Sequence, residues 1–317
     1  MLKVTVLDGY AANPGDLDWN IFKDIAELTV YDRTPPELVV ERIGDSDAIF
    51  LNKVNITKQI IEQCPKLKYI GVMATGYNVV DTKAAREAGI TVTNIPAYST
   101  DSVAQHTFAL ILNFTNQVEQ HSQSVQNGDW IKSPDFCYWK SPLTELKGKT
   151  LGIFGFGSIG QKVAEIAHAF GMNVIIHVHS PNSFKGNEKA VSLDELFEQS
   201  DFITLHAPMT AETAQLINKN TISKMKKTAV IINTARGGLV NEGDLRQALD
   251  EGQIAGYAAD VIGTEPMKNA CPLYKAKNCV LTPHIAWAPL EARQRLFKIA
   301  LENLKAFAAG KSINVVN

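Results

Sequence analysis

Short runs of β-branched and apolar residues alternate with helix-like stretches along most of the chain, and this alternation restricts the fold more than any other feature. The pattern is typical of βαβ units, in which parallel strands form a sheet whose two faces are covered by helices. Two separate series of such units are present. The runs that we predict to be strands lie at residues 4–7, 48–51, 69–72 and 91–94 in the first series and at 150–154, 173–178, 202–205, 229–233, 254–258 and 279–281 in the second. The sequence therefore predicts an α/β protein with two doubly wound parallel sheets.

The length of the chain agrees with two domains, because 317 residues exceed the usual size of one domain and provide a core for each of two. Between the two series, residues 101–126 contain an apolar stretch that suits a long, largely buried helix bridging the domains. Residues 126–142 are rich in turn-forming residues and suit an ordered loop. Further helices are predicted at residues 36–43, 57–63, 80–88, 161–170 and 290–309.

Charge and hydropathy exclude two classes of partner. The chain has 31 basic and 33 acidic residues, a formal net charge of −2, and its Lys and Arg are scattered rather than clustered. We therefore expect no binding to nucleic acid or to an anionic membrane. No stretch approaches the ~18 continuous apolar residues of a membrane span. Residues 1–7 alternate like a strand rather than forming a signal peptide, so a cytoplasmic location is expected.

Cysteines and histidines give no sign of a metal centre. The four cysteines, Cys64, Cys137, Cys271 and Cys279, have no C-x-x-C spacing, and a chain of this size needs no disulfide to hold it together. The histidines lack a metal-ligand spacing supported by carboxylates. We expect reduced thiols and no metal.

A G-x-G-x-x-G sequence follows the predicted strand at 150–154 and precedes the predicted helix at 161–170. In this setting Gly155 permits a tight turn, Gly157 lets the backbone approach a pyrophosphate, and Gly160 lets helix and strand pack closely. The N-terminus of the helix adds unpaired N–H groups for the anion. The residues of this loop that we expect to bind a dinucleotide are Gly155, Gly157, Ser158, Ile159 and Gly160.

The end of the next strand leaves the choice of dinucleotide open. An acidic residue there would bind the ribose 2′-hydroxyl of NAD, but the chain has Val178, His179 and Ser180 at this place. Lys185 and Lys189 follow in a predicted loop and do not repel a 2′-phosphate. The cofactor is therefore predicted to be NAD or NADP.

Three residues of the second series combine into an acid–base set. Each follows an apolar strand, and in open α/β sheets ligands bind beyond these strand ends. Arg236 offers a planar fork for a bidentate grip on the carboxylate of a 2-keto acid. His284 can give or take a proton near neutral pH, and Glu265 can stabilise its imidazolium form.

With these motifs the chain resembles the family of D-isomer-specific 2-hydroxyacid dehydrogenases, which are NAD(P)-dependent oxidoreductases. The resemblance extends over six ordered motifs, at residues 74–81, 155–160, 206–213, 233–238, 265–266 and 283–284. It implies two Rossmann-like domains, with a cofactor domain at residues 100–289 inserted into a substrate domain at 1–99 and 290–317. It also implies a homodimer formed through residues 101–126.

The resemblance implies roles for single residues. Arg236, Glu265 and His284 match the family's catalytic residues, and Asp260 matches an aspartate that orients the nicotinamide. The other residues matched to cofactor binding are His206, Ala207, Pro208, Thr213, Thr234 and Ala235, together with Val178, His179 and Ser180 at the ribose. Residues 74–81 resemble the loop that binds the substrate carboxylate, which assigns Thr75 and Gly76, with Arg236, to the substrate.

Within the family, residues 52–54 and 284–293 look most like glycerate dehydrogenases, also called hydroxypyruvate reductases. Lys53 and Trp287 would then shape a pocket for a short polar keto acid. The alternatives, less favoured, are a surface cation for Lys53 and a packed aromatic side chain for Trp287. The chain departs from the family at Gln105, where a glutamate is common.

The expected function is NAD(P)-dependent reduction of hydroxypyruvate, or of a similar small 2-keto acid, to the D-2-hydroxy acid, and the reverse reaction. One alternative is a sibling enzyme, a D-lactate-type or D-3-phosphoglycerate dehydrogenase. Another, of a different class, is a nucleotide-sensing binding protein that resembles the dehydrogenase-related corepressors.

Overall fold

The computed structural model describes residues 1–178, 184 and 186–317, and the chain divides into two compact units. Unit 1 consists of Met1–Ser99 and Trp287–Asn317, and unit 2 consists of Thr100–Ala286. The return from unit 2 to unit 1 thus lies between Ala286 and Trp287, near the residue 289 expected from the sequence.

Unit 1 contains a five-stranded sheet in which all neighbouring strands are parallel, in the order β2-β1-β3-β4-β5. The strands are β1 (Leu2–Val6), β2 (Ala26–Val30), β3 (Ala48–Leu51), β4 (Tyr69–Val72) and β5 (Thr91–Thr93). The helices are α1 (Gly9–Ala12), η1 (Trp19–Phe22), η2 (Pro36–Leu38), α2 (Val39–Ile43), α3 (Lys58–Gln63), α4 (Thr82–Glu87) and α11 (Leu290–Ala308), of which η1 and η2 are 3₁₀ helices. The strand order reverses between β1 and β3, which is where ligands bind in doubly wound sheets.

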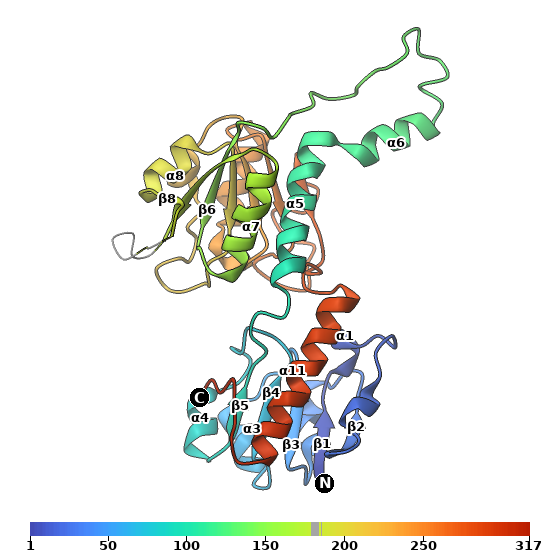
Figure 1. Ribbon diagram of the computed structural model, residues 1–317, viewed down its shortest axis with the longest axis vertical. Coiled ribbons are helices and arrows are strands. Elements are labelled where there is room, and N and C mark those ends of the chain that lie inside the picture. Colours follow the sequence, from blue (N-terminus) through green and yellow to red (C-terminus); the bar gives the residue numbers. More distant parts are fainter. Residues whose placement is uncertain (179–183, 185) are drawn as a thin grey trace. The chain divides into compact units, whose positions relative to one another are not determined.

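The two faces of this sheet are buried by different helices, because alternate side chains of a strand point to opposite sides. Leu296 and Phe297 of α11 pack with Phe50 in one core cluster, and Figure 1 shows α11 lying along that face of the sheet. Ile49 and Ile70 point to the other face, into a cluster covered by α2, α3 and α4. The sheet is therefore buried on both faces, as expected for parallel strands.

The edge strand β2 was not predicted from the sequence. It pairs with β1 from Leu2↔Ala26 to Val6↔Val30, but only Ala26 of its five residues is buried. A strand at the edge of a sheet with a mostly exposed face lacks the continuous apolar run by which the central strands were recognised.

Unit 2 contains a seven-stranded parallel sheet, in the order β12-β11-β10-β9-β6-β7-β8. The strands are β6 (Thr150–Phe154), β7 (Asn173–His177), β8 (Lys189–Ala190), β9 (Phe202–Leu205), β10 (Val230–Asn233), β11 (Gly256–Ala259) and β12 (Cys279–Leu281). The helices are α5 (Thr100–Asn116), α6 (Val118–Gln126), α7 (Ser158–Ala169), α8 (Leu193–Gln199), α9 (Lys219–Ile222), η4 (Gly237–Leu239) and α10 (Glu242–Asp250), where η4 is a 3₁₀ helix. Here the order reverses between β6 and β9.

The faces of the second sheet are again covered by separate helices (Figure 1). Phe108 of α5 and Val163 of α7 pack with Ile153 on one face. Leu196 of α8 and Leu245 of α10 belong to the cluster on the other face. Among the described residues, no helix is both long and apolar enough to span a membrane.

The single helix predicted at residues 101–126 is wrong, because the structure has two helices there, α5 and α6. Gln117 separates them in the left-handed conformation, with φ 50° and ψ 41°. The Thr115 hydroxyl lies 2.7 Å from Asn116 Oδ1 and 3.4 Å from the carbonyl of Leu112, and such side-chain bonds compete with a continuing helix. The apolar face that holds α5 on the sheet also ends here, since Ser124 is the buried residue of α6.

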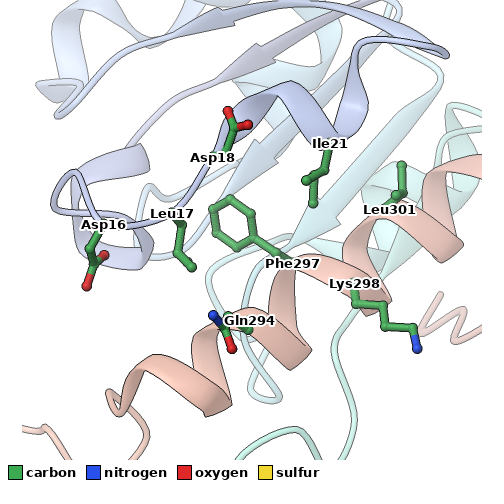
Figure 2. Close-up of a pocket in the computed structure, with 8 residues that line it drawn as sticks. All are labelled: Asp16, Leu17, Asp18, Ile21, Gln294, Phe297, Lys298 and Leu301. Atoms are coloured by element: carbon green, nitrogen blue, oxygen red, sulfur yellow. The ribbon is translucent and has the colours of Figure 1, made fainter.

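A hollow in unit 1 lies where α11 faces the segment that leads into η1 (Figure 2). None of the site residues predicted from the sequence lines it. The residues that do are Asp16, Leu17, Asp18, Ile21, Gln294, Phe297, Lys298 and Leu301.

Candidate active site

The residues predicted to bind the cofactor and to act on the substrate follow the strands of unit 2. Because neighbouring strands are parallel, their carboxyl ends lie at one edge of the sheet, and ligands bind at this edge beside the reversal of strand order. The glycine loop follows β6 and the 206–208 segment follows β9, which are the two strands at the reversal. The other predicted residues follow at Val178 after β7, Thr234 to Arg236 after β10, Asp260 after β11 and His284 after β12.

The three glycines of the loop differ in what a side chain would meet. Gly155 has φ +90°, and a Cβ there would lie 2.7 Å from the backbone nitrogen of Ala207. A Cβ on Gly160 would lie 2.4 Å from the carbonyl oxygen of Gly155. A Cβ on Gly157 would meet nothing within 4 Å, and Gly157 directly precedes Ser158, the first residue of α7. Open space at the N-terminus of a helix fits a pyrophosphate, so the loop fits a dinucleotide.

The segment after β9 lies against this loop. His206 carries a ring Nε2 that is buried and has no hydrogen-bond partner among the described residues, and burial lowers the pKa of His206 to about 3. The ring is therefore neutral near pH 7. Thr213 stabilises the turn that follows, because its hydroxyl donates to the carbonyl of Pro208 at 2.8 Å and accepts from the Thr210 amide at 2.8 Å. The unpaired Nε2 is a polar atom that a bound ligand can satisfy.

The residues predicted to meet the adenosine ribose are only partly described. Val178 follows β7 and packs against the core cluster of α5 and α7. His179, Ser180 and Lys185 lie outside the described residues. Lys189 begins β8, the edge strand. The choice between NAD and NADP therefore stays open.

The loop that carries Arg236 is held by the buried side chain of Asn233. The Asn233 amide nitrogen donates to the carbonyl of Arg236 at 2.9 Å, and its amide oxygen accepts from the N–H of Ala235 at 3.0 Å. Thr234 shares a hydrogen bond with Thr107 of α5 at 3.1 Å. The Arg236 side chain is exposed, and its Nη1 donates to the carbonyl of Ala235 at 2.6 Å.

The structure brings His284 and Glu265 together. The ring Nδ1 of His284 donates to Glu265 Oε2 at 2.6 Å, and the side chains are 28% and 34% exposed, so both can reach solvent or a ligand. The second carboxylate oxygen of Glu265 accepts from the N–H of Ile262 at 3.2 Å. His284 has φ +57°, a left-handed conformation that is uncommon for a residue with a Cβ.

Asp260 holds the turn that contains His284. Its buried carboxylate accepts from the Thr282 hydroxyl at 2.6 Å and from the amides of Ile285 at 2.8 Å and Ala286 at 2.7 Å. His106 Nε2 lies 2.9 Å from the Thr282 hydroxyl and 3.6 Å from Asp260 Oδ1. These contacts assign Asp260 a part in orienting His284, and its role toward the nicotinamide stays a prediction.

The predicted substrate residues Lys53, Thr75 and Gly76 lie in unit 1, after β3 and β4. The Asp8 carboxylate, which follows β1, accepts from the amides of Asn52 at 2.7 Å, Lys53 at 2.6 Å and Val54 at 3.2 Å. Burial raises the pKa of Asp8 although these N–H groups favour its charged form.

The loop after β4 is joined to this arrangement. The side-chain amide nitrogen of Asn52 donates to the carbonyl of Met73 at 2.7 Å, and the Thr75 hydroxyl donates to the carbonyl of Ile95 at 2.8 Å. Trp287 packs against the core cluster of α11. Among the residues that the structure describes, no group of three or more His, Cys, Asp and Glu side chains is placed to hold a metal.

Several residues around the site were missed by the sequence analysis. Asp8, Glu242 and Thr282 each hold a loop that carries a predicted site residue. Asp8 and Thr282 do share one signal with the recognised residues, since Thr282 directly follows β12 and Asp8 lies two residues after β1. Glu242 has no such signal, because it lies within the first turn of a helix.

Comparison with known proteins identifies the class to which this fold and site belong. The family model for the NAD-binding domain of D-isomer specific 2-hydroxyacid dehydrogenases matches residues 108–286. The chain belongs to this family, and it is accordingly an oxidoreductase that uses a nicotinamide dinucleotide.

Particular relatives narrow the comparison. The chain is 48% identical to a hydroxypyruvate reductase of Blautia hydrogenotrophica over 321 residues, covering 100% of both chains. It is 40% identical to a glycerate dehydrogenase of Methylorubrum extorquens, over 99% of this chain and 98% of the relative. Among solved structures, an NADPH-dependent glyoxylate/hydroxypyruvate reductase of Sinorhizobium meliloti in complex with citrate superposes with a TM-score of 0.86 at 28% identity, covering 100% of this chain and 98% of the other.

We predict that Gly157→Ala leaves the protein folded but weakens cofactor binding at least tenfold. Its Cβ meets no protein atom, so the thermal midpoint should stay near that of the wild type, while the methyl group enters the space assigned to the pyrophosphate. Gly160→Ala is the matched comparison, and it should lower the midpoint because its Cβ meets the Gly155 carbonyl. Thermal melts and fluorescence titration with NADH and NADPH measure both effects. Unchanged affinity in Gly157→Ala would place the pyrophosphate elsewhere.

Proposed function

We propose that this enzyme reduces hydroxypyruvate, or a 2-keto acid of similar size, to the D-2-hydroxy acid, and catalyses the reverse reaction. The observation that supports this most directly is the hydrogen-bonded pair of His284 and Glu265, which lies on the loops after β12 and β11. The names of the two full-length relatives support the choice of substrate. We propose a cytoplasmic location and no nucleic-acid partner.

Each catalytic residue has a separate role in the proposed reaction. Bound NADH or NADPH supplies the hydride that is added to the keto carbon. Arg236 binds the substrate carboxylate through its planar fork and orients the keto group. Because Nδ1 of His284 is engaged by Glu265, the proton for the keto oxygen comes from Nε2. The Glu265 carboxylate stabilises the imidazolium form that carries this proton.

Lys53, Thr75 and Gly76 are proposed to bind the substrate. Lys53 is exposed, and its backbone is fixed because its N–H donates to the Asp8 carboxylate. A sibling activity on a phosphorylated or larger keto acid remains the alternative within the family. A nucleotide-sensing protein without turnover is the alternative of another class.

A panel of 2-keto acids tests the proposal. Hydroxypyruvate, glyoxylate, pyruvate and the keto acid derived from 3-phosphoglycerate are each offered with NADH and with NADPH, and the loss of reduced-cofactor absorbance is measured. The highest kcat/KM is expected for hydroxypyruvate or glyoxylate. A preference for the phosphorylated acid would assign the sibling function. Tight cofactor binding without turnover of any acid would favour the sensing protein.

Arg236→Lys is expected to keep the fold and to lose most of the activity, because a point charge cannot reproduce a bidentate grip. The loss of one oriented, charge-assisted contact costs on the order of 2–4 kcal/mol in the transition state. Arg246→Lys is the control, since Arg246 forms an exposed ion pair with Asp250 on α10. Steady-state kinetics compare the variants, and a near-normal kcat/KM in Arg236→Lys would remove this residue from the mechanism.

The pH dependence of the two directions should have opposite signs. Reduction requires the imidazolium of His284 and falls as the ring loses its proton, whereas oxidation requires the neutral ring and rises over the same range. Glu265→Gln removes the negative partner, so the falling limb of reduction should move to lower pH with cofactor affinity unchanged. His284→Ala should abolish both directions. An equal loss of rate at every pH in Glu265→Gln would make Glu265 a structural residue of its turn.

The exposed apolar side chains of α6 and of the residues after it support the proposed homodimer. Among the described residues, several large apolar side chains of this region are exposed, although such side chains are seldom left in water together. They are Val118, Trp130, Ile131, Phe136, Trp139 and Leu143. The segment is tied to α6 by hydrogen bonds of Ser124 to Asp129 and Tyr138, at 2.6 and 2.9 Å. We propose that a second copy of the chain covers this surface.

The double variant Ile131→Glu/Phe136→Glu should be monomeric where the wild type is a dimer, because both side chains are 89% exposed and two charges would oppose their burial between copies. Light scattering after size exclusion gives the mass of each. Ile21→Glu, a partly exposed apolar residue of unit 1, is the control and should leave the dimer intact. A monomeric wild type would contradict the proposal.

A further inference from the structure

The peptide unit between Ile262 and Gly263 is held from two sides. On one side lies Gly237, directly after Arg236, and a Cβ there would come within 2.0 Å of the Ile262 carbonyl oxygen and 2.5 Å of the Gly263 nitrogen. Any residue other than glycine at 237 would displace the peptide. On the other side, the N–H of Gly263 donates to Glu242 Oε1 at 2.7 Å. This peptide is therefore a fixed point between the Arg236 loop and the Glu265 loop.

The preceding peptide unit, between Val261 and Ile262, leads directly to the acid–base pair. The N–H of Ile262 donates to Glu265 Oε1 at 3.2 Å, and Glu265 Oε2 accepts from His284 Nδ1 at 2.6 Å. A shift of the Ile262–Gly263 peptide would move Ile262, and with it the N–H that fixes one oxygen of the Glu265 carboxylate. The hydrogen bond between Glu265 Oε2 and the His284 imidazolium would then be weaker.

Glu242 is itself well placed to hold the peptide. It is the first residue of α10, after the N-cap residue Asn241, and is partly buried. Its second oxygen, Oε2, accepts a weak bond from the Cys271 thiol at 3.8 Å. The nearby Cys279 thiol stays neutral, since burial raises its pKa to about 12. A carboxylate in the first turn of a helix is also favoured by the helix dipole.

We propose that Glu242 is a positioning residue of the reaction, which acts through the Gly263 N–H to keep the Glu265 carboxylate against His284. The inference deepens the proposed function and rests on it. Glu242 accepts from the Gly263 N–H and from the Cys271 thiol, so its effect is expected on the orientation of Glu265 rather than on cofactor binding.

Two conservative variants of Glu242 distinguish the effect of side-chain length from the effect of charge. Glu242→Asp keeps the negative charge at the start of α10 but is one methylene too short to reach Gly263. Glu242→Gln loses the charge but keeps an oxygen at the same reach, which can accept the Gly263 N–H. If the hydrogen bond matters, Glu242→Asp is impaired and Glu242→Gln is rescued. If only charge at the helix N-terminus matters, the order is reversed and the inference is overturned.

The experiment measures kcat, KM and the pH profile of keto-acid reduction, together with NADH affinity and the thermal midpoint. Glu242→Asp should lower kcat on the order of 10–100-fold, the range for a small displacement of a catalytic group. The falling limb of the pH profile of reduction should move to lower pH in Glu242→Asp, with NADH affinity unchanged. Glu242→Gln should retain most of the wild-type rate. Asp244→Ala is the matched control, because Asp244 lies in the same turn of α10 but accepts from the Lys219 amide at 2.9 Å.

A substrate-free measurement distinguishes failure of this inference from failure of the proposed function. The titration of the His284 ring, followed by NMR, should move to lower pH in Glu242→Asp and stay in place in Glu242→Gln and Asp244→Ala. A wild type that turns over no keto acid would contradict the proposed function while leaving this titration to decide the inference. If the His284 ring titrates over the same pH range in the wild type and in all three variants, the inference is overturned, whatever the activities are.

Discussion

The parallel pairing of every strand in the two described sheets is the constraint on which the site depends. Parallel strands require crossover helices, and these bury both faces of each sheet. Function is then confined to the loops at the carboxyl edge. In unit 2 this edge carries the glycine loop, the Arg236 loop, and the loops of Glu265 and His284. In unit 1 it carries Asp8, Lys53 and Thr75. Within each unit, residues far apart in sequence are therefore brought to one sheet edge, because each follows its own strand.

A recurring arrangement fixes these loops, in which a carboxylate accepts hydrogen bonds from the N–H groups of a neighbouring loop. Asp8 holds the loop at Lys53, Asp260 holds the turn at His284, and Glu242 holds the loop at Glu265. Loop N–H groups lack partners in the sheet, and a carboxylate has two oxygens that only accept. Charge-assisted bonds of this kind are shorter and stronger than neutral ones. These acids thus fix the geometry of the loops that carry the predicted site residues.

The sequence predicted the buried strands and the residues at their ends, because both have local signals. The glycine pattern in its strand–helix setting indicated the dinucleotide loop, and in the structure Gly155 and Gly160 leave no space for a side chain. The edge strand β2 was missed because most of its side chains are exposed. The break at Gln117 was missed because the apolar pattern of α5 stops without a proline or glycine. Glu242 was missed since its bond to Gly263 joins residues 21 apart, which no pattern within one helix can show.

His284 shows how these constraints combine at one residue. Its φ of +57° costs about 1 kcal/mol or more for a side chain with a Cβ, and glycine would avoid that cost but lacks the imidazole. The left-handed turn directs the amides of Ile285 and Ala286 to the buried carboxylate of Asp260, which offsets the strain. Glu265 then fixes the ring through Nδ1. The backbone and the ring are thus held by different acids from different loops. The hydrogen bonds that fix the ring are therefore separate from those that fix the backbone turn.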